Sequence, residues 1–176
     1  GKATEKPPAG SLSWLATGHL PAEGALAYAL PLPAALLEQQ LPVFLRLTLT
    51  WFSAMEGRGG PYRLSRCWAE LPPKNPLGLR AVQPNRQPLR RSTVWHEEYR
   101  SRAGARSPRE QEGPKDGTTP SAELRLKVNA RPVHRQLIPA GEVPFALVVS
   151  LWTDPPAPLE EWFAQDEGLP LEEAYS

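Results

Sequence analysis

The chain has 176 residues, which suits one domain with a sizeable hydrophobic core and would be cramped for two. Its 22 prolines and 13 glycines exclude a mainly helical protein, because both residues interrupt helices, and they predict frequent turns. The single cysteine, Cys67, excludes an internal disulfide framework and a cysteine-rich metal site, so a reducing, cytoplasmic location is expected.

Eight segments have the alternation or the β-branched and aromatic content of strands. In chain order they are 12–20, 25–32, 43–53, 62–71, 77–82, 92–100, 123–131 and 145–152. The alternation is clearest in the third of these, where Val43, Leu45, Leu47, Leu49 and Trp51 form one apolar face. Short helical turns are predicted at 33–40 and 158–165, each beginning with a proline.

The fold class follows from these segments. Many short strands without long helices predict an all-β, antiparallel β-sandwich of the jelly-roll kind, with about eight strands. An immunoglobulin-like strand order is an open alternative. Residues 1–153 are expected to form the sandwich, with a mobile loop at 101–121 where hydrophobic residues nearly vanish. A linker between two domains is the rival interpretation of that loop.

Charge is unevenly distributed along the chain. Residues 154–176 form an acidic, proline-containing tail, and the net charge of +1 divides into −7 for this tail and +8 for residues 1–153. Between Arg80 and Arg109 there are eight arginines and only two acids. Either these segments are solvated, or they dock onto the domain itself or a neighbour. The candidate interaction residues are Arg80, Arg86, Arg90, Arg91, His96, Trp152, Trp162 and Phe163.

Nucleic acid, sugars and membranes are the other classes of partner to consider. A nucleic-acid partner is not expected, because the whole-chain charge is nearly balanced and no nucleic-acid-binding motif occurs. The six tryptophans would suit a sugar platform, but most have strand-like or apolar surroundings and are expected in the core. Trp152 and Trp162 are the candidates for exposure. No apolar run has the length of a membrane span, so no membrane partner is expected.

No residue is assigned a catalytic or metal-binding role, and no cofactor is expected. His96 and Glu98 would share one face of their strand, with Glu97 on the other. A zinc site or an acid–base pair could be built on these residues, but zinc usually needs three or four ligands at recognised spacings. A hydrogen-bonded histidine at a strand edge is therefore the preferred interpretation. Cys67 is expected to be a small buried hydrophobe.

Five segments together resemble a known family. They are LTLTWFS at 47–53, YR at 62–63, STVWHE at 92–97, LRLKVNAR at 124–131 and PFALVVSL at 144–151. In this order they look like the C-terminal β-rich region of bacterial, intracellular subtilisin-like serine peptidases, some of which are associated with defence against phage. The sequence departs from that pattern at Trp95, at Ala130 and in the acidic tail.

The resemblance covers residues 12–151 in outline and implies a role without catalysis. In such peptidases the Asp, His and Ser motifs belong to a separate α/β domain, and no such motif is present here. The resemblance therefore implies an accessory domain that stabilises a catalytic domain or mediates protein contacts. A stand-alone binding module for a polyanion or a glycan is the alternative.

Overall fold

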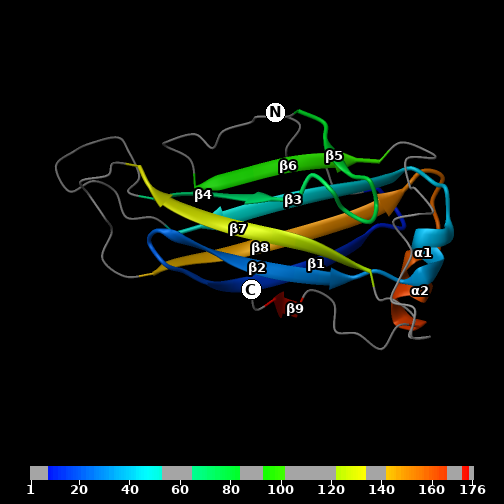
Figure 1. Cartoon of the computed structure of the whole chain (residues 1–176), viewed down its shortest axis with the longest axis horizontal. Coiled ribbons are helices and arrows are strands. Elements are labelled where there is room, and N and C mark those ends of the chain that lie inside the picture. The colour runs from blue at the N-terminus through cyan, green and yellow to red at the C-terminus, as the bar shows by residue number, and fades with distance from the viewer. Residues whose placement is uncertain are drawn as a thin grey trace.

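A computed structural model describes residues 8–52, 65–83, 93–101, 122–133, 142–165 and 172–174 (Figure 1). Nine strands and two short helices lie in these residues. The strands are β1 (Leu12–Leu20), β2 (Gly24–Pro31), β3 (Val43–Trp51), β4 (Ser65–Glu70), β5 (Arg80–Ala81), β6 (Val94–Arg100), β7 (Glu123–Pro132), β8 (Val143–Thr153) and β9 (Glu172–Ala174). The helices are α1 (Ala34–Glu38) and α2 (Leu159–Gln165).

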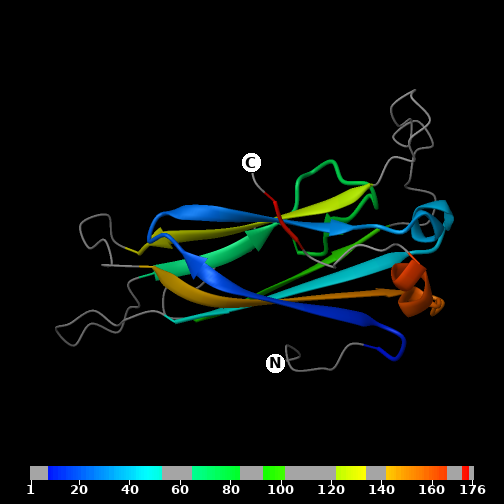
Figure 2. The same ribbon diagram turned by 90° about the horizontal axis from the view of Figure 1, so that it is seen from below.

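The strands form two sheets that face each other, as the two layers in Figure 2 show. The five-stranded sheet has the order β1-β8-β3-β6-β5, and the four-stranded sheet has the order β4-β7-β2-β9. Every pair of neighbouring strands is antiparallel. The prediction of an all-β, antiparallel sandwich is therefore confirmed.

The pairing order is that of a jelly roll. β1 pairs with β8, β2 with β7 and β3 with β6, which is the nested pattern produced when one long antiparallel hairpin is rolled up. Pairing of β8 with β3 and of β7 with β4 joins these pairs into two sheets, and β5 beside β6 and β9 beside β2 complete them. An immunoglobulin order would instead place β1 beside β2 in one sheet, and here these strands lie in different sheets.

The core lies between the sheets and consists mainly of leucine. Val43, Leu45, Leu47, Leu49 and Trp51 on β3 are all buried, as their alternation predicts. Each pairs in register with a buried residue of β8, so the two central strands present one continuous apolar surface to the other sheet. Fully burying a leucine side chain contributes on the order of 2 kcal/mol, so this surface is a major source of stability.

The prediction for 77–82 is only partly right, because β5 has two residues. The side chain of Asn75 holds the preceding segment in a turn: its Oδ1 accepts a hydrogen bond from the Leu79 amide at 2.7 Å. Its Nδ2 donates to the carbonyl oxygen of Leu79 at 2.9 Å. Gly78 has a φ of 63°, which favours glycine, so Leu77 and Leu79 enter the core from a turn instead of a strand.

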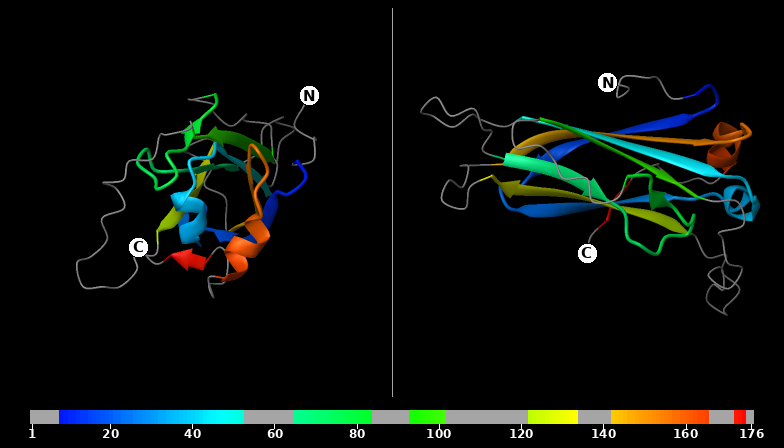
Figure 3. Two further views of the ribbon diagram at one scale, coloured as in Figure 1. Left: turned by 90° about the vertical axis from the view of Figure 1, so that its right-hand side faces the viewer. Right: turned by 90° about the horizontal axis from the view of Figure 1, so that it is seen from above.

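The two helices close one end of the sandwich, as the left panel of Figure 3 shows. Leu36 of α1 and Leu159 of α2 are buried in the core. Within the residues that the structure describes, neither helix has the length and apolar character needed to cross a membrane. Because α2 belongs to residues 154–176, the burial of Leu159 shows that part of the acidic tail is packed on the sandwich. β9 adds a second contact of the tail by pairing with β2. Of the loop expected at 101–121, only Ser101 lies within the described residues, where it is buried and accepts a hydrogen bond from the Val43 amide.

Candidate protein-binding surface

The side of the five-stranded sheet that is turned away from the core carries the main candidate site, called the outer face below. Alternation puts every second residue of β1, β8, β3 and β6 on it, because the residues between them are buried in β8, β3 and β6 and mostly half-buried in β1. Pairing in register then arranges these side chains in rows across the sheet. One row runs Trp152, Phe44, Arg100 and Arg80, and another runs Leu15, Val148, Thr48 and His96.

An ordered cluster occupies one end of the outer face. The rings of Phe44 and Trp152 are stacked, with centroids 5.7 Å apart and planes 4° apart. The guanidinium carbon of Arg46 lies 5.3 Å from the centre of the Trp152 ring. Arg46 Nη2 and Nε also donate to Glu98 Oε1, at 3.0 and 3.1 Å. Each of the four side chains therefore restrains another.

The energy of the Arg46–Glu98 pair depends on its exposure. The side chain of Arg46 is 17% exposed and that of Glu98 is 47% exposed, so water screens the carboxylate strongly. An ion pair of this kind contributes about 1 kcal/mol or less to folding. Its effect is mainly to fix the position of the guanidinium group above Trp152.

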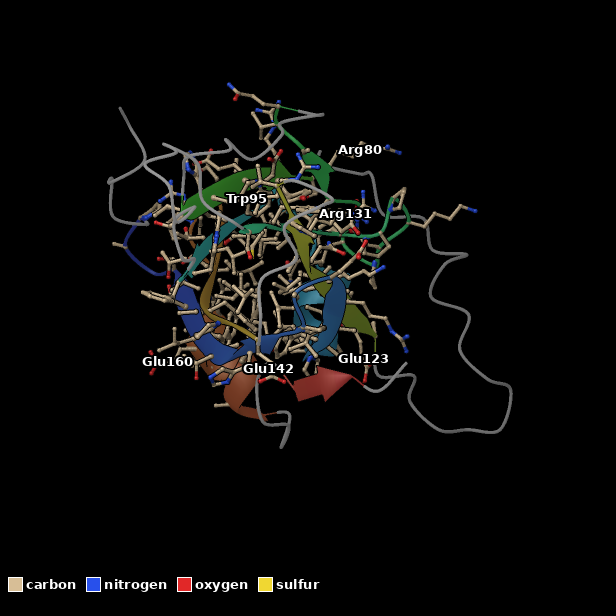
Figure 4. The ribbon with its side chains drawn as sticks, turned by 90° about the vertical axis from the view of Figure 1, so that its left-hand side faces the viewer. Arg80, Trp95, Glu123, Arg131, Glu142 and Glu160 are labelled. Carbon is tan, nitrogen blue, oxygen red and sulfur yellow. The ribbon has the colours of Figure 1, made fainter. Side chains whose placement is uncertain are left out.

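His96 lies on the outer face at the end of its row, because among the described residues β5 pairs only with Tyr99 and Arg100 of β6. It is half-buried, and it is the register partner of Thr48 on the neighbouring strand. Glu98 shares its face, whereas Glu97 is buried on the inner face, as alternation predicts. Trp95, which is labelled in Figure 4, is buried on the inner side of β6.

Exposed apolar side chains concentrate on the outer face. Among the described residues, five large hydrophobic side chains are exposed: Leu15, Val94 and Val148 lie on this face, and Phe52 and Val82 directly follow β3 and β5 of the same sheet. Leu15 and Phe52 are 67% and 72% exposed. Leu15 and Val148 are register partners, and Phe52 follows β3 where its amide bonds to Pro144. Leu15 and Val148 therefore form an exposed apolar pair, and exposed apolar surface is a candidate binding site for another macromolecule.

The structure brings three of the eight candidate residues onto one face. Arg80 is exposed on β5 (Figure 4), His96 lies on β6 and Trp152 on β8. Arg80 is the register partner of Arg100, so two exposed arginines lie together beside the aromatic pair. Arg86, Arg90 and Arg91 lie outside the described residues.

The last two candidates, Trp162 and Phe163, pack within the domain itself. Both are half-buried on α2 and lie against the core. The ring of Phe163 is 5.0 Å from that of Trp14 on β1, at a tilt of 57°. Their contacts therefore hold α2 on the sandwich.

The tryptophans follow the predicted division only in part. Trp51 and Trp95 are buried, as expected, and Trp152 is half-buried and not fully exposed. Trp14, Trp162 and Trp68 are half-buried and pack against the core, and Trp68 has a cationic neighbour. It is half-buried on β4, and the guanidinium carbon of Arg131 lies 5.7 Å from its ring centre.

Two reactive groups lie in the interior. Cys67 is buried as expected, and burial raises its thiol pKa to about 12. Burial also raises the pKa of Tyr99 to about 12, and the nearby Glu97 carboxylate adds to the shift. Both groups are therefore neutral at neutral pH. In the described part of the chain, no three His, Cys, Asp or Glu side chains are grouped so that they could hold a metal ion.

Sequence reasoning missed Phe44 and Arg46 as members of the site. Their signal was present, because both belong to the outward-facing set of β3, where an aromatic residue is out of place unless something covers it. The stacking partner, Trp152, is more than a hundred residues away and becomes a neighbour only when β8 pairs with β3.

Comparison of the chain with models of known protein families, with curated proteins and with solved structures gives no match. The functional interpretation therefore depends on the surface and on the family resemblance of the sequence motifs.

Proposed function

We propose that this chain is a non-catalytic accessory domain of a subtilisin-like serine peptidase, which binds the catalytic domain through the outer face. One observation carries the proposal: of the five exposed large apolar side chains among the described residues, Leu15, Val94 and Val148 lie on that face, and the other two directly follow strands of the same sheet. A protein surface of complementary shape would cover them, and burial of apolar area drives such association.

The chemistry of the outer face favours a protein partner. Its uncharged residues Leu15, Val148 and Thr48 form one row across β1, β8 and β3, and its charged groups are Arg46 on β3 and the charged residues of β6 and β5. Protein interfaces likewise combine apolar surface with polar and charged groups. Trp152, Phe44 and Arg46 are of the types most enriched among residues that dominate binding energy.

The family resemblance concerns the same part of the molecule. Three of its motifs, at 47–53, 92–97 and 144–151, fall largely on β3, β6 and β8, which are neighbours in the five-stranded sheet. Those motifs alternate between core and outer face, so they specify both the packing of the sheet and the surface that it presents.

The test is binding to a defined catalytic chain. The domain would be co-expressed with the subtilisin-like catalytic chain encoded directly beside it, and the affinity of the purified pair would be measured by calorimetry. Leu15→Asp and Val148→Asp each put a charge into the apolar part of the outer face, and we expect each to weaken binding at least tenfold.

The matched control is Ala164→Asp, which places the same charge at an exposed position on α2. It is expected to leave affinity within about twofold of the parent chain. If no subtilisin-like chain is encoded beside this segment, or if all three variants bind equally well, the proposal is wrong.

A polyanion-binding function is the second candidate, and one observation favours it. Arg80 and Arg100 are exposed register partners, next to aromatic rings in the same row. Arginine with stacking side chains is a common combination in single-strand binding. This function predicts retention on heparin that falls steeply with salt and is lost in the double variant Arg80→Ala and Arg100→Ala. Without such retention only the protein-docking function remains.

A further inference from the structure

The edge of β2 in the four-stranded sheet is a second surface with features of a binding site. All eight residues of β2 pair with β7 on one side, whereas only Ala27–Ala29 pair with β9 on the other. Figure 1 shows β9 as a short strand lying against β2. Most of this edge strand is therefore left without a β9 partner.

The sequence of β2 does little to protect that edge. Natural edge strands are blunted by charged residues, bulges or central prolines. β2 reads GALAYALP, with no charge and with its only proline at the last position. Its residues on the side away from the core are Ala25, Ala27 and Ala29, all with short side chains; Ala25 is exposed, Ala27 is half-buried and Ala29 is buried.

The neighbouring strand supplies positive charge. Arg125 and Lys127 of β7 are exposed register partners of Ala29 and Ala27. Arg125 is 72% exposed, and its ion pair with Glu123 is long, at 3.9 Å. Alanine is short, so these long cationic side chains can extend across β2 toward a strand on its far side. Figure 4 shows Glu123 on the side of the molecule where β9 lies.

The resident strand is acidic at the matching position. Glu172 is the register partner of Ala29, so one row across the sheet has the order Arg125, Ala29, Glu172. The segment 166–176 contains four acids and no Lys or Arg. Leu159 fixes α2 on the sandwich, so Glu172–Ala174 are covalently linked to an element of the same domain, which raises their effective concentration at the edge.

The geometry points to the edge of β2, with Arg125 and Lys127, as a binding site for an extended acidic peptide of a partner protein. The chain's own residues 172–174 occupy part of it, and the partner peptide adds to the sheet antiparallel to β2 in the same place. Backbone hydrogen bonds give affinity in this mode of recognition, and the cationic pair selects acidic side chains. This inference concerns the other sheet and is independent of the proposed function.

The test uses the full chain and a labelled peptide of sequence DEGLPLEEAYS, which corresponds to residues 166–176. Binding is followed by fluorescence anisotropy. In the parent chain the site is already occupied, so weak binding is expected. The variant Glu172→Lys with Glu173→Lys puts a positive charge into the row of Arg125 and removes both acids of β9, which should release the resident strand. Peptide affinity is then expected to rise at least tenfold and to fall with salt.

Charge reversal tests the cationic pair. Adding Arg125→Glu and Lys127→Glu to the opened variant is expected to lower affinity for the acidic peptide at least tenfold, and a peptide with lysines in place of its glutamates should bind this variant better. Arg131→Glu is the matched control: it reverses a charge on the same strand but pairs with Arg66 on β4, away from β2. Circular dichroism checks that each variant is folded.

Hydrogen exchange locates the peptide. Slower exchange of the β2 amides on peptide binding is expected, with β3 unchanged. The inference is overturned if the opened variant does not bind the peptide, if Arg131→Glu weakens binding as much as the Arg125 and Lys127 reversal, or if a scrambled acidic peptide or heparin binds equally well. The last result would identify a general polyanion surface.

Discussion

The guanidinium group of Arg46 lies over the indole ring of Trp152, 5.3 Å from its centre, on the outer face of the five-stranded sheet. Trp152 is stacked on Phe44, and Arg46 is bonded to Glu98, so the arrangement is fixed from both sides. A surface with ordered side chains loses less conformational entropy when a partner binds. This pre-organisation is why these residues are expected to dominate docking.

Replacing Arg46 with alanine should affect binding more than folding. We expect a loss of roughly 0.5–1.5 kcal/mol in the free energy of unfolding, because the cation–π contact and the ion pair each contribute about 1 kcal/mol or less. Arg46→Lys keeps the charge but loses the planar group, so its affinity should be intermediate. Urea denaturation measures the stability, and calorimetry the affinity. A stability loss above about 3 kcal/mol would instead identify Arg46 as a structural residue.

A core residue should show the opposite behaviour. Leu47 is fully buried between the sheets, and Leu47→Ala is expected to lower the free energy of unfolding by about 2–5 kcal/mol. Leu15→Ala, on the exposed face, is the control and should stay within about 0.5 kcal/mol of the parent chain. Urea midpoints at unchanged m-value give both numbers. Equal losses would mean that Leu15 is not free on the surface.

Local sequence patterns predicted most of the strands, because burial of one face imposes a period of two on each. The segment 43–53 is the clearest case, and Leu12–Leu20 has the expected bounds. The turn at Asn75 was missed because its cause is a set of side-chain hydrogen bonds that apolar periodicity does not reveal. β9 was missed because three residues carry no periodicity, and their pairing depends on the available edge of β2.

The candidate site was less predictable than the fold. Arg80, His96 and Trp152 were chosen for separate reasons, and nothing in the local sequence shows that β5, β6 and β8 belong to one sheet. The side chains of Trp162 and Phe163 look like free anchors in an acidic tail until α2 is seen against Trp14. The burial of these two side chains depends on tertiary contacts, which the local sequence does not show.

Alkaline pH should destabilise the domain in two steps. The pKa of Cys67 is raised from 9.0 to about 12, and that of Tyr99 from 10.0 to about 12. Each group stays neutral in the folded state while the unfolded chain ionises. The stability is therefore fully present below pH 9 and is lost as pH rises toward 12, by about 1.4 kcal/mol per pH unit for each group.

Variants separate the two steps. Cys67→Ala should flatten the loss of stability between pH 9 and 10, where Tyr99 does not yet contribute. Tyr99→Phe should leave that range unchanged and reduce the slope above pH 10. Urea denaturation at a series of pH values gives the profile. A parent chain with constant stability from pH 9 to 11 would contradict the burial of both groups.

The thiol of Cys67 should be chemically inert in the folded protein. Only the thiolate reacts with disulfide reagents, and the neutral, fully buried thiol offers neither the charge nor the access. At pH 8 we expect no reaction with Ellman's reagent over the time in which the urea-unfolded chain reacts completely. Rapid labelling of the native domain would show that the β4 side of the core opens readily.

The most direct test of the docking proposal is a map of the contact surface by NMR cross-saturation, with the methyl groups of the domain labelled and the catalytic chain saturated. Strong effects at the methyl groups of Leu15, Val94 and Val148, with none at buried Leu36 of α1, are the predicted result. Effects confined to Ala25 and Ala27, on the four-stranded sheet, would contradict it.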